Sequence, residues 1–339
     1  MFIKDLWYFV LPGNKLKPGT LLARTLLDEP VVIGRAADGG VFALRDVCPH
    51  RGMPLSYGRL GEQGITCCYH GWCFDTQGEC VDIPCLSEAE RFDTRRIKVR
   101  SYPCREVQGN VWIYMGDTDP PVTQIPALPP VADGAAQIWL SMKLECDVDY
   151  AALGLIDPAH TPYVHHSPIW RSPGARREKT KHFAPSGLGF VMSRHQASSN
   201  SSAYRLLGGT PEVEIDFQLP GVRIEHIQAG KNRFCGLTTV TPVSSSETQI
   251  DHLMYWNMPW LTLFRPVVRL LSKYFLNQDR DATVKLRAGL PYQERPMFVR
   301  EPDAQAKWYF SLKESYLQSV AEQRPFTNPL TEQTLHWKT

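Results

Sequence analysis

The sequence has no run of 18 or more apolar residues, so it offers no candidate for a membrane-spanning helix. The nearest candidate, residues 260–276, is interrupted by three basic residues and a proline, which predicts an amphipathic helix instead. The short apolar stretch at residues 6–11 follows Lys4 and Asp5, and it lacks the basic start and long apolar core of a signal peptide. We therefore expect a soluble, cytoplasmic protein.

An excess of positive charge is also lacking. The 37 Lys and Arg residues are balanced by 35 Asp and Glu residues, which gives a formal net charge of +2. Nucleic-acid binding requires a concentrated basic face, so we expect no nucleic-acid partner. Internal repeats and low-complexity tracts are absent as well. A hydrophobic content of 43% is normal for a globular protein with a sizeable core.

Cysteine is present in an odd number and is unevenly distributed. Six of the nine cysteines lie between Cys48 and Cys85. Because no export signal is recognised, we expect reduced thiols and not disulfides, with some of the thiols ligating a metal.

Length and turn signals predict two domains. Residues 1–116 contain short strand-like runs separated by turns, which indicates an all-β barrel or sandwich. Residues 117–135 form a proline-rich linker, because five prolines between residues 117 and 130 prevent a helix or an inner strand. Residues 136–339 mix strand-like and helical segments, which predicts an α+β domain with an antiparallel sheet flanked by helices.

Two short segments of the first domain carry paired Cys and His residues. Cys48-x-His50 is followed by Cys67-x-x-His70, so each segment supplies one thiolate and one imidazole. Two ligands of each kind can bind one zinc ion or the two irons of a [2Fe–2S] cluster. Zinc sites usually pair Cys with Cys and His with His, so the mixed pairs favour the cluster over a structural zinc site.

The segments CPHRG, from Cys48, and CCYHGW, from Cys67, resemble the cluster-binding loops of Rieske non-haem iron oxygenases. The resemblance implies an all-β Rieske domain whose [2Fe–2S] cluster is held by Cys48, His50, Cys67 and His70. Cys68 stands where the family commonly has proline, a departure that touches no ligand. A Rieske domain alone needs only about the first hundred residues, so the rest of the chain must have another task.

The second domain contains the pattern Asp157-x2-His160-x4-His165, which begins at the end of the apolar run Ala151–Ile156. On a regular helix, histidines five positions apart diverge. Pro162 lies between them and breaks the helix, so both imidazoles can face one ion. Two His and one carboxylate form the facial triad of non-haem Fe(II) oxygenases, which leaves positions open for O2 and substrate. Taken without the first motif, a pair of structural histidines would explain the pattern equally well.

The third iron ligand is expected on a helix near residues 275–286. On that helix Asp279 shares its face with apolar or small residues, whereas Asp281 shares its face with polar residues and should face water. A buried carboxylate without a partner is costly, and a metal would supply the partner. The Rieske oxygenases place their acidic ligand after an acidic or amide residue, which matches Gln278-Asp279. We therefore prefer Asp279 to Asp281.

The resemblance gives Asp157 the role of a bridge, hydrogen-bonded to His160 and to a cluster-binding histidine of a neighbouring subunit. Such a carboxylate orients the imidazole and offers a short path for electrons. The residues alone also allow a helix N-cap before Pro158. Gly154 stands where many relatives carry Asn or Asp, close to the iron, so the substrate cannot be copied from any one relative.

The resemblance implies a terminal oxygenase with a [2Fe–2S] cluster and Fe2+, which uses O2 and electrons from NAD(P)H. A separate ferredoxin and/or flavin reductase would deliver these electrons, and transfer between subunits implies a homotrimer. The short chain is similar to the monooxygenase and demethylase branch, which includes vanillate and dicamba demethylases and pheophorbide a oxygenase. We expect hydroxylation or oxidative demethylation of an aromatic or polycyclic hydrophobic substrate.

Two alternatives remain open. A cis-dihydroxylating dioxygenase would share every ligand, and a Rieske electron-transfer protein would lack the second metal site. Apolar and aromatic segments supply candidates for the substrate pocket, although the same content suits a core. These candidates are Gly154, Leu237, Met254, Trp256 and Leu276.

Overall fold

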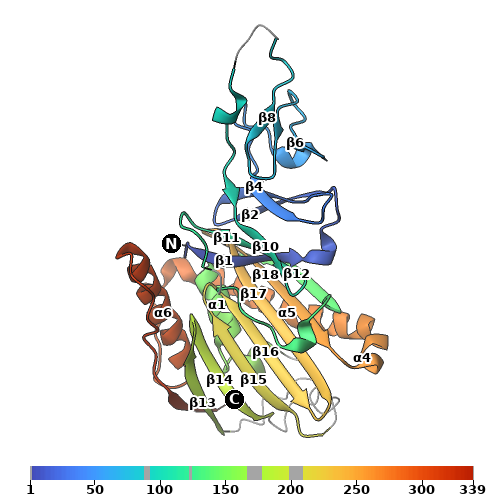
Figure 1. Ribbon diagram of the computed structural model, residues 1–339. Helices are drawn as coiled ribbons and strands as arrows, with labels where there is room; N and C mark the ends of the chain where they lie inside the picture. Colours follow the sequence, from blue (N-terminus) through green and yellow to red (C-terminus); the bar gives the residue numbers. More distant parts are fainter. Residues whose placement is uncertain (1, 88–91, 122–123, 166–177, 198–208, 339) are drawn as a thin grey trace. The chain divides into compact units, whose positions relative to one another are not determined.

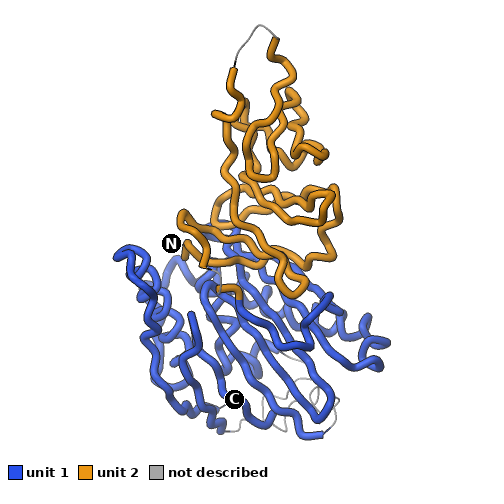
Figure 2. Tube along the Cα trace, in the orientation of Figure 1, with its two compact units in different colours: residues 1, 126–339 blue, residues 2–125 orange. Residues whose placement is uncertain are grey.

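The computed structural model describes residues 2–87, 92–121, 124–165, 178–197 and 209–338 (Figure 1). The chain forms two compact units, one of residues 2–125 and one of residues 126–339 (Figure 2). The division falls inside the proline-rich segment. No helix in these described ranges is long and apolar enough to cross a membrane.

The N-terminal unit consists of short strands joined by turns and three 3-10 turns. The 3-10 turns are η1 (Gly13–Lys15), η2 (Leu55–Tyr57) and η3 (Thr94–Arg96). The strands are β1 (Leu6–Pro12), β2 (Leu21–Leu26), β3 (Glu29–Arg35), β4 (Val41–Arg45), β5 (Arg59–Gly61), β6 (Gly64–Thr66), β7 (Cys73–Phe74), β8 (Cys80–Asp82), β9 (Ser101–Tyr102), β10 (Cys104–Val107) and β11 (Asn110–Met115).

These strands form three antiparallel sheets, in the orders β1-β11-β10, β2-β3-β4-β9 and β5-β6-β7-β8. β1 and β11 are buried along their whole length, and their aromatic side chains pair across the strands. Phe9 packs edge-on against Trp112, and Trp7 packs against Tyr114, each with ring centroids 5.6 Å apart. Such cross-strand aromatic pairs stabilise the sheet beyond their hydrogen bonds.

The C-terminal unit is organised around one antiparallel sheet of eight strands, in the order β12-β18-β17-β16-β15-β14-β13-β19. The strands are β12 (Ile138–Leu144), β13 (Glu178–Ser186), β14 (Gly189–Gln196), β15 (Glu212–Gln218), β16 (Val222–Ala229), β17 (Asn232–Ser244), β18 (Glu247–Trp256) and β19 (Gln333–Lys338). The helices are α1 (Val148–Ile156), α2 (Thr161–Val164), α4 (Pro259–Leu263), α5 (Arg265–Gly289) and α6 (Ala304–Ala321), with 3-10 turns η4 (Pro130–Ala132) and η5 (Leu290–Tyr292).

Helices cover one face of this sheet, which we call the helix-covered face (Figure 1). The Ser272 hydroxyl of α5 lies 3.7 Å from the sulfur of Met254 on β18. Tyr309 of α6 packs against Phe217 of β15, with ring centroids 6.0 Å apart. Residues paired across antiparallel strands point to the same face, so the strand register assigns each side chain to one face. The predicted fold class, an all-β unit followed by an α+β unit with an antiparallel sheet, is confirmed.

A partly buried polar contact fixes α1 against α6. Lys313 donates to both carboxylate oxygens of Asp149, at 2.5 and 2.7 Å, and the Tyr309 hydroxyl donates to the same carboxylate at 2.6 Å. The Lys313 side chain is only 12% exposed, so this ion pair is screened much less than a surface pair. The contact therefore holds in place the helix that leads directly to Asp157.

Candidate metal centres

Two loops of the N-terminal unit have matching backbone geometry around the four candidate cluster ligands. The Gly52 N–H donates to the carbonyl of Cys48 at 2.9 Å, and the Gly71 N–H donates to the carbonyl of Cys67 at 3.1 Å. Both glycines have a φ of +76°, in the left-handed region that side chains disfavour. A Cβ atom on Gly71 would also lie 3.1 Å from Pro84 Cγ. Each loop is thus a tight turn that requires its glycine.

The side chains of these loops suit a pair of metal ions. Cys48 and Cys67 are buried, and the rings of His50 and His70 lie 4.5 Å apart between centroids. Burial, reinforced by the adjacent Cys67 thiol, raises the pKa of Cys48 to about 11, so two thiolates here would require cations beside them. Among the described residues, the ligand atoms of His160, His165 and Asp279 lie close enough together for one ion, and those of these four residues do not. The wider spacing of the four fits a two-iron cluster better than one zinc ion.

A second group of candidate ligands converges in the C-terminal unit. The Nε2 atom of His165 lies 3.2 Å from Asp279 Oδ1, and the Nε2 atom of His160 lies 3.7 Å from the same oxygen. One ligand atom from each residue lies within 4.8 Å of the others. Asp281, the alternative, is 60% exposed and pairs with Arg280. The geometry thus brings Asp279, and not Asp281, to the two histidines.

Unpaired nitrogens indicate that this group fits a metal ion. The His165 side chain is fully buried, and its Nε2 atom faces Asp279 Oδ1 but forms no hydrogen bond of good geometry with any described residue. Its other ring nitrogen lies 3.2 Å from the Gln278 side-chain oxygen, which fixes the ring orientation. An unsatisfied buried nitrogen is costly, and a metal ion would satisfy it.

Asp157 contacts His160 at Nδ1, the ring nitrogen that does not face Asp279. Its carboxylate lies 3.5 Å from His160 Nδ1 and accepts a hydrogen bond from the Ala159 N–H at 2.7 Å. Burial opposes ionisation of both groups, but their mutual contact outweighs it. The pKa of Asp157 is therefore lowered and the pKa of His160 is raised, with Asp279 adding to the latter shift. The Nε2 atom of His160 is left facing Asp279.

The break in the helix lies earlier than the sequence predicts. α1 ends at Ile156, and Asp157 is its C-terminal cap with an extended backbone, followed by Pro158. The one-turn helix α2 then begins after His160, with Pro162 in its first turn, and His165 is its C-terminal cap. The interpretation of Asp157 as an N-cap is wrong, because no helix begins at Pro158: Asp157 ends α1, and α2 begins at Thr161 with His160 as its N-cap.

Comparison with known families decides the nature of the N-terminal unit. The family model described as the Rieske [2Fe-2S] domain matches residues 6–103. Residues 6–103 are a Rieske domain.

The fold of the whole chain is similar to that of a solved structure. The crystal structure of dicamba monooxygenase bound to dicamba matches with a TM-score of 0.77 and 23% identity, over 95% of this chain and 99% of that chain. At this identity the match establishes the fold of both units. The fold match thus covers the N-terminal and the C-terminal unit.

Two curated relatives are similar over about half of the chain. Chlorophyllide a oxygenase of Arabidopsis thaliana is 34% identical over 165 residues, which are 49% of this chain and 30% of the relative. The oxygenase component of dicamba O-demethylase of Stenotrophomonas maltophilia is 34% identical over 172 residues, which are 49% of this chain and 48% of the relative. The chain thus aligns with less than half the length of either relative.

The Rieske domain contains an aromatic contact that sequence reasoning missed. The ring of Trp72 stacks on the ring of His50 with a centroid distance of 4.4 Å and an interplanar angle of 4°. The Nε1 atom of Trp72 is buried and has no hydrogen-bond partner among the described residues. Trp72 belongs to the second loop and His50 to the first, so the contact joins both loops. Its position in the CCYHGW motif was the available signal.

The candidate pocket residues do not all face the same way. Met254 and Trp256 on β18 point to the helix-covered face, and buried Leu276 lies on α5. Gly154 is exposed on α1, with open space where a Cβ would be. The prediction that Leu237 lines the same pocket is wrong. It pairs with Leu253, and the side-chain alternation turns both to the opposite face, away from Met254.

A polar group on the helix-covered face was also missed. His252 on β18 bonds to the Thr238 hydroxyl through Nδ1 at 2.7 Å, and Arg223 pairs with Glu225 at 3.2 Å on β16. Burial lowers the pKa of His252 to about 4, so its ring is neutral at pH 7. The negative charge of Asp279 opposes this shift and raises the pKa of His252. The helix-covered face near Met254 thus carries polar side chains as well as apolar ones.

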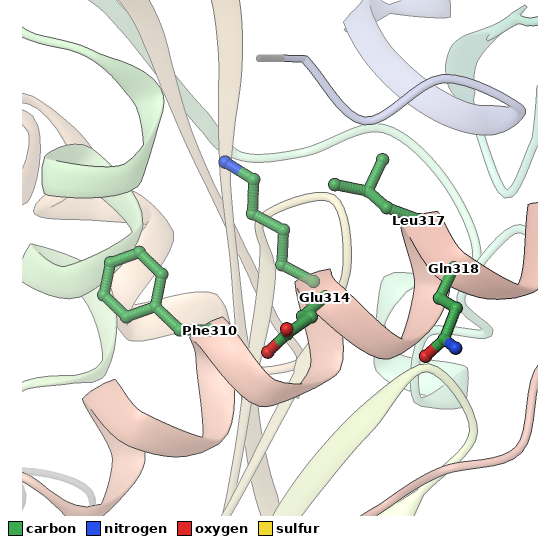
Figure 3. Close-up of a pocket in the computed structure, with 5 residues that line it drawn as sticks. Phe310, Glu314, Leu317 and Gln318 are labelled. Carbon is green, nitrogen blue, oxygen red and sulfur yellow. The ribbon is translucent and has the colours of Figure 1, made fainter. Parts of the chain in front are cut away.

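Two cavities lie away from the histidine pair. One, of about 610 Å³, lies along α6 and is lined by Phe310, Lys313, Glu314, Leu317 and Gln318 (Figure 3). The other, of about 330 Å³, is lined by residues 127–130 and by β15 and β16 side chains that include Asp216 and His226. Neither cavity is lined by a candidate metal ligand, so we assign the substrate to neither.

Proposed function

We propose that this chain is the terminal oxygenase of a Rieske non-haem iron system. One observation carries the proposal: His160, His165 and Asp279 converge within 4.8 Å of one another, in a chain that also contains a Rieske domain. An electron-transfer Rieske protein would not need this second ligand group. The curated relatives are themselves named as oxygenases, which supports the same reading.

Each ligand set has a distinct task. Cys48, His50, Cys67 and His70 would hold the [2Fe–2S] cluster, and His160, His165 and Asp279 would hold Fe2+. When bound, the cluster supplies single electrons and the iron supplies O2 activation. Around the iron ligands, Asp157 faces His160 Nδ1 and Gln278 faces His165 Nδ1, so each imidazole presents Nε2 to the same point.

Electron supply and assembly follow from this assignment. A ferredoxin and/or flavin reductase would bring electrons from NAD(P)H to the cluster, with the protein acting in the cytoplasm. We assign the Rieske domain to residues 1–116, the linker to residues 117–135 and the catalytic domain to residues 136–339. In a homotrimer, Asp157 would join His160 to a cluster-binding histidine of the next subunit. Its side chain is 38% exposed, so the carboxylate is accessible to such a partner.

The substrate is an aromatic or polycyclic hydrophobic compound that is hydroxylated or oxidatively demethylated. Met254 and Trp256 provide apolar surface on the helix-covered face, next to α5, which carries Leu276 and Asp279. His252 adds a neutral hydrogen-bonding group to the same face. A flat apolar molecule with an uncharged polar substituent suits these walls.

The test is turnover with 18O2 by the purified protein, a surrogate ferredoxin and reductase, and NADH. Methoxylated aromatic and polycyclic compounds form the substrate panel. One labelled oxygen in the product, or formaldehyde from a methoxy group, supports the proposal. A cis-diol with two labelled oxygens would assign the dioxygenase alternative. Cluster reduction without any product across the panel, by protein with its mononuclear iron in place, would favour electron transfer alone.

A further inference from the structure

A cavity of about 330 Å³ lies against the sheet of the C-terminal unit, and no candidate metal ligand lines it. Residues 127–130 form one wall, and four side chains of β15 and β16 form the other. These four share one face of the sheet, because they are paired across the two strands or alternate along them. They are Glu214, Asp216, Ile224 and His226.

This face of the sheet is the one opposite the helix-covered face. Ile224 pairs with Leu237 on β17, and Leu237 points away from Met254, which contacts α5. After residues 127–130 the chain continues into η4, which packs against β17 and β18. The cavity is thus bounded by a short segment on one side and by the sheet on the other, and the sheet separates it from the proposed substrate site.

Two polar atoms of the residues that line this cavity are buried without a hydrogen bond. Asp216 accepts a hydrogen bond from the Gln218 side chain at Oδ2, at 2.7 Å. Its Oδ1 atom forms no hydrogen bond of good geometry with any described residue, although the Ser186 hydroxyl lies near the carboxylate. The Nε2 atom of His226 is likewise buried and without a partner in the described part of the chain. Unpaired buried groups are costly, so both atoms are suited to bind a ligand.

The charged groups that line the cavity are carboxylates. Arg194 lies 3.8 Å from Glu214, but these side chains are 44% and 39% exposed, so solvent screens the pair. Burial raises the pKa of Asp216, and the nearby Glu214 adds to this shift, so the site favours a positive charge beside the two carboxylates. Burial lowers the pKa of His226, so its ring is neutral at pH 7 and can accept a hydrogen bond.

The spacing of these groups favours an organic molecule over a metal ion. Among the described residues, only His160, His165 and Asp279 bring three ligand atoms within 4.8 Å of one another. A water molecule occupies about 30 Å³ of liquid, so the cavity is also larger than a single water needs. Residues 127–130 and Ile224 give the rest of the lining an apolar character, which suits a carbon skeleton.

We propose that this cavity is a binding site for a small organic amine in its ammonium form. The ammonium group would donate to Asp216 Oδ1 and His226 Nε2, and its charge would balance the carboxylates of Asp216 and Glu214. Its carbon skeleton would pack against residues 127–130 and Ile224. A bound amine would thus hold this segment against the sheet. Binding does not depend on the oxygenase reaction, because the cavity is on the other face of the sheet.

The experiment is isothermal titration calorimetry of the purified full-length protein with benzylamine. We expect saturable binding, and much weaker binding of benzyl alcohol and benzoate, which resemble benzylamine in shape but are neutral or negatively charged. Asp216→Asn and His226→Phe should each bind benzylamine about tenfold more weakly, because each loses a hydrogen bond to the ammonium group. Glu212→Gln is the matched control and should bind like the unmodified protein, because Glu212 is on the same face of β15 but is exposed and outside the cavity.

Three results of the titrations would overturn the proposal: no binding of benzylamine, equal affinity in the unmodified protein and both cavity variants, or binding of benzoate as tight as that of benzylamine. A crystal structure of the unmodified protein soaked with benzylamine gives an answer that does not depend on how the variants fold. An amine nitrogen within hydrogen-bond distance of Asp216 supports the proposal, and benzylamine only beside His160 and His165, or nowhere, contradicts it. Turnover assays of the same variants report separately on the oxygenase proposal.

Discussion

The Nε2 atom of His165 lies 3.2 Å from Oδ1 of Asp279, although the two residues belong to different helices. The imidazole is stacked on Phe275, one turn before Asp279 on α5, with ring centroids 3.5 Å apart. Gln278 contacts its other nitrogen. One helix therefore supplies the stacking partner, the orienting amide and the carboxylate, so the site is formed when α2 packs against α5.

This relationship predicts that Asp279→Ala removes the mononuclear iron and leaves the cluster intact. Loss of the carboxylate leaves two imidazoles, which hold Fe2+ poorly. Iron should fall from about three to about two per chain while sulfide stays at about two. Asp281→Asn is the matched control, because that side chain is 60% exposed and should leave iron content unchanged. Loss of iron in the control but not in Asp279→Ala would reverse the assignment.

The stack of Trp72 on His50 predicts a shift in the cluster's reduction potential. The indole face favours positive charge on the neighbouring ring and excludes water, and both effects stabilise the oxidised cluster. Trp72→Leu should raise the potential, and Trp72→Phe should raise it less, because phenyl retains part of the contact. A redox titration followed by visible absorbance measures both variants. A lowered potential in both would mean that Trp72 acts through its N–H group instead.

Burial of His252 predicts a dependence of stability on pH. Its pKa falls from 6.5 to about 4 in the folded protein because burial disfavours the imidazolium. Between these pH values the unfolded chain binds a proton that the folded protein does not, so stability decreases as pH falls through this window. His252→Gln should reduce the slope of unfolding free energy against pH by up to about 1.4 kcal/mol per pH unit. Urea unfolding at several pH values measures it, and an unchanged slope would contradict the buried neutral ring.

Because β17 and β18 have two different faces, truncating an apolar side chain on each face should have a different kind of effect. Met254→Ala shortens a side chain on the helix-covered face and so leaves extra space beside the proposed substrate. It should raise KM and uncouple O2 consumption from product formation. Leu237→Ala leaves a cavity on the other face and should cost about 2–5 kcal/mol of stability with an unchanged product profile. Product analysis and thermal unfolding separate these effects. A product change from Leu237→Ala alone would contradict the register.

The sequence predicts best where the chemistry is local. The two cluster loops are short motifs with required glycines, and the structure gives both the same left-handed glycine conformation. Helical periodicity separated Asp279 from Asp281, because one face of α5 packs on the sheet while Asp281 points to solvent. These features depend on a few neighbouring residues, so a sequence pattern contains them.

Features that depend on distant pairing were missed or misplaced. β13 carries charged residues among its first positions, and it becomes a strand through pairing with β14 and with β19 near the C-terminal end. Leu237 was assigned to the pocket because β17 is buried on both faces, so alternation of polar and apolar residues does not show which face is which. Trp72 reaches His50 only when two separate loops meet.

The most direct test of the central claim is metal analysis with absorbance spectra of anaerobically purified protein, before and after dithionite. About three irons and two sulfides per chain, with visible bands that bleach on reduction, are the predicted result for a Rieske cluster plus one iron at His160, His165 and Asp279. A colourless protein that holds one zinc and no sulfide would contradict the account.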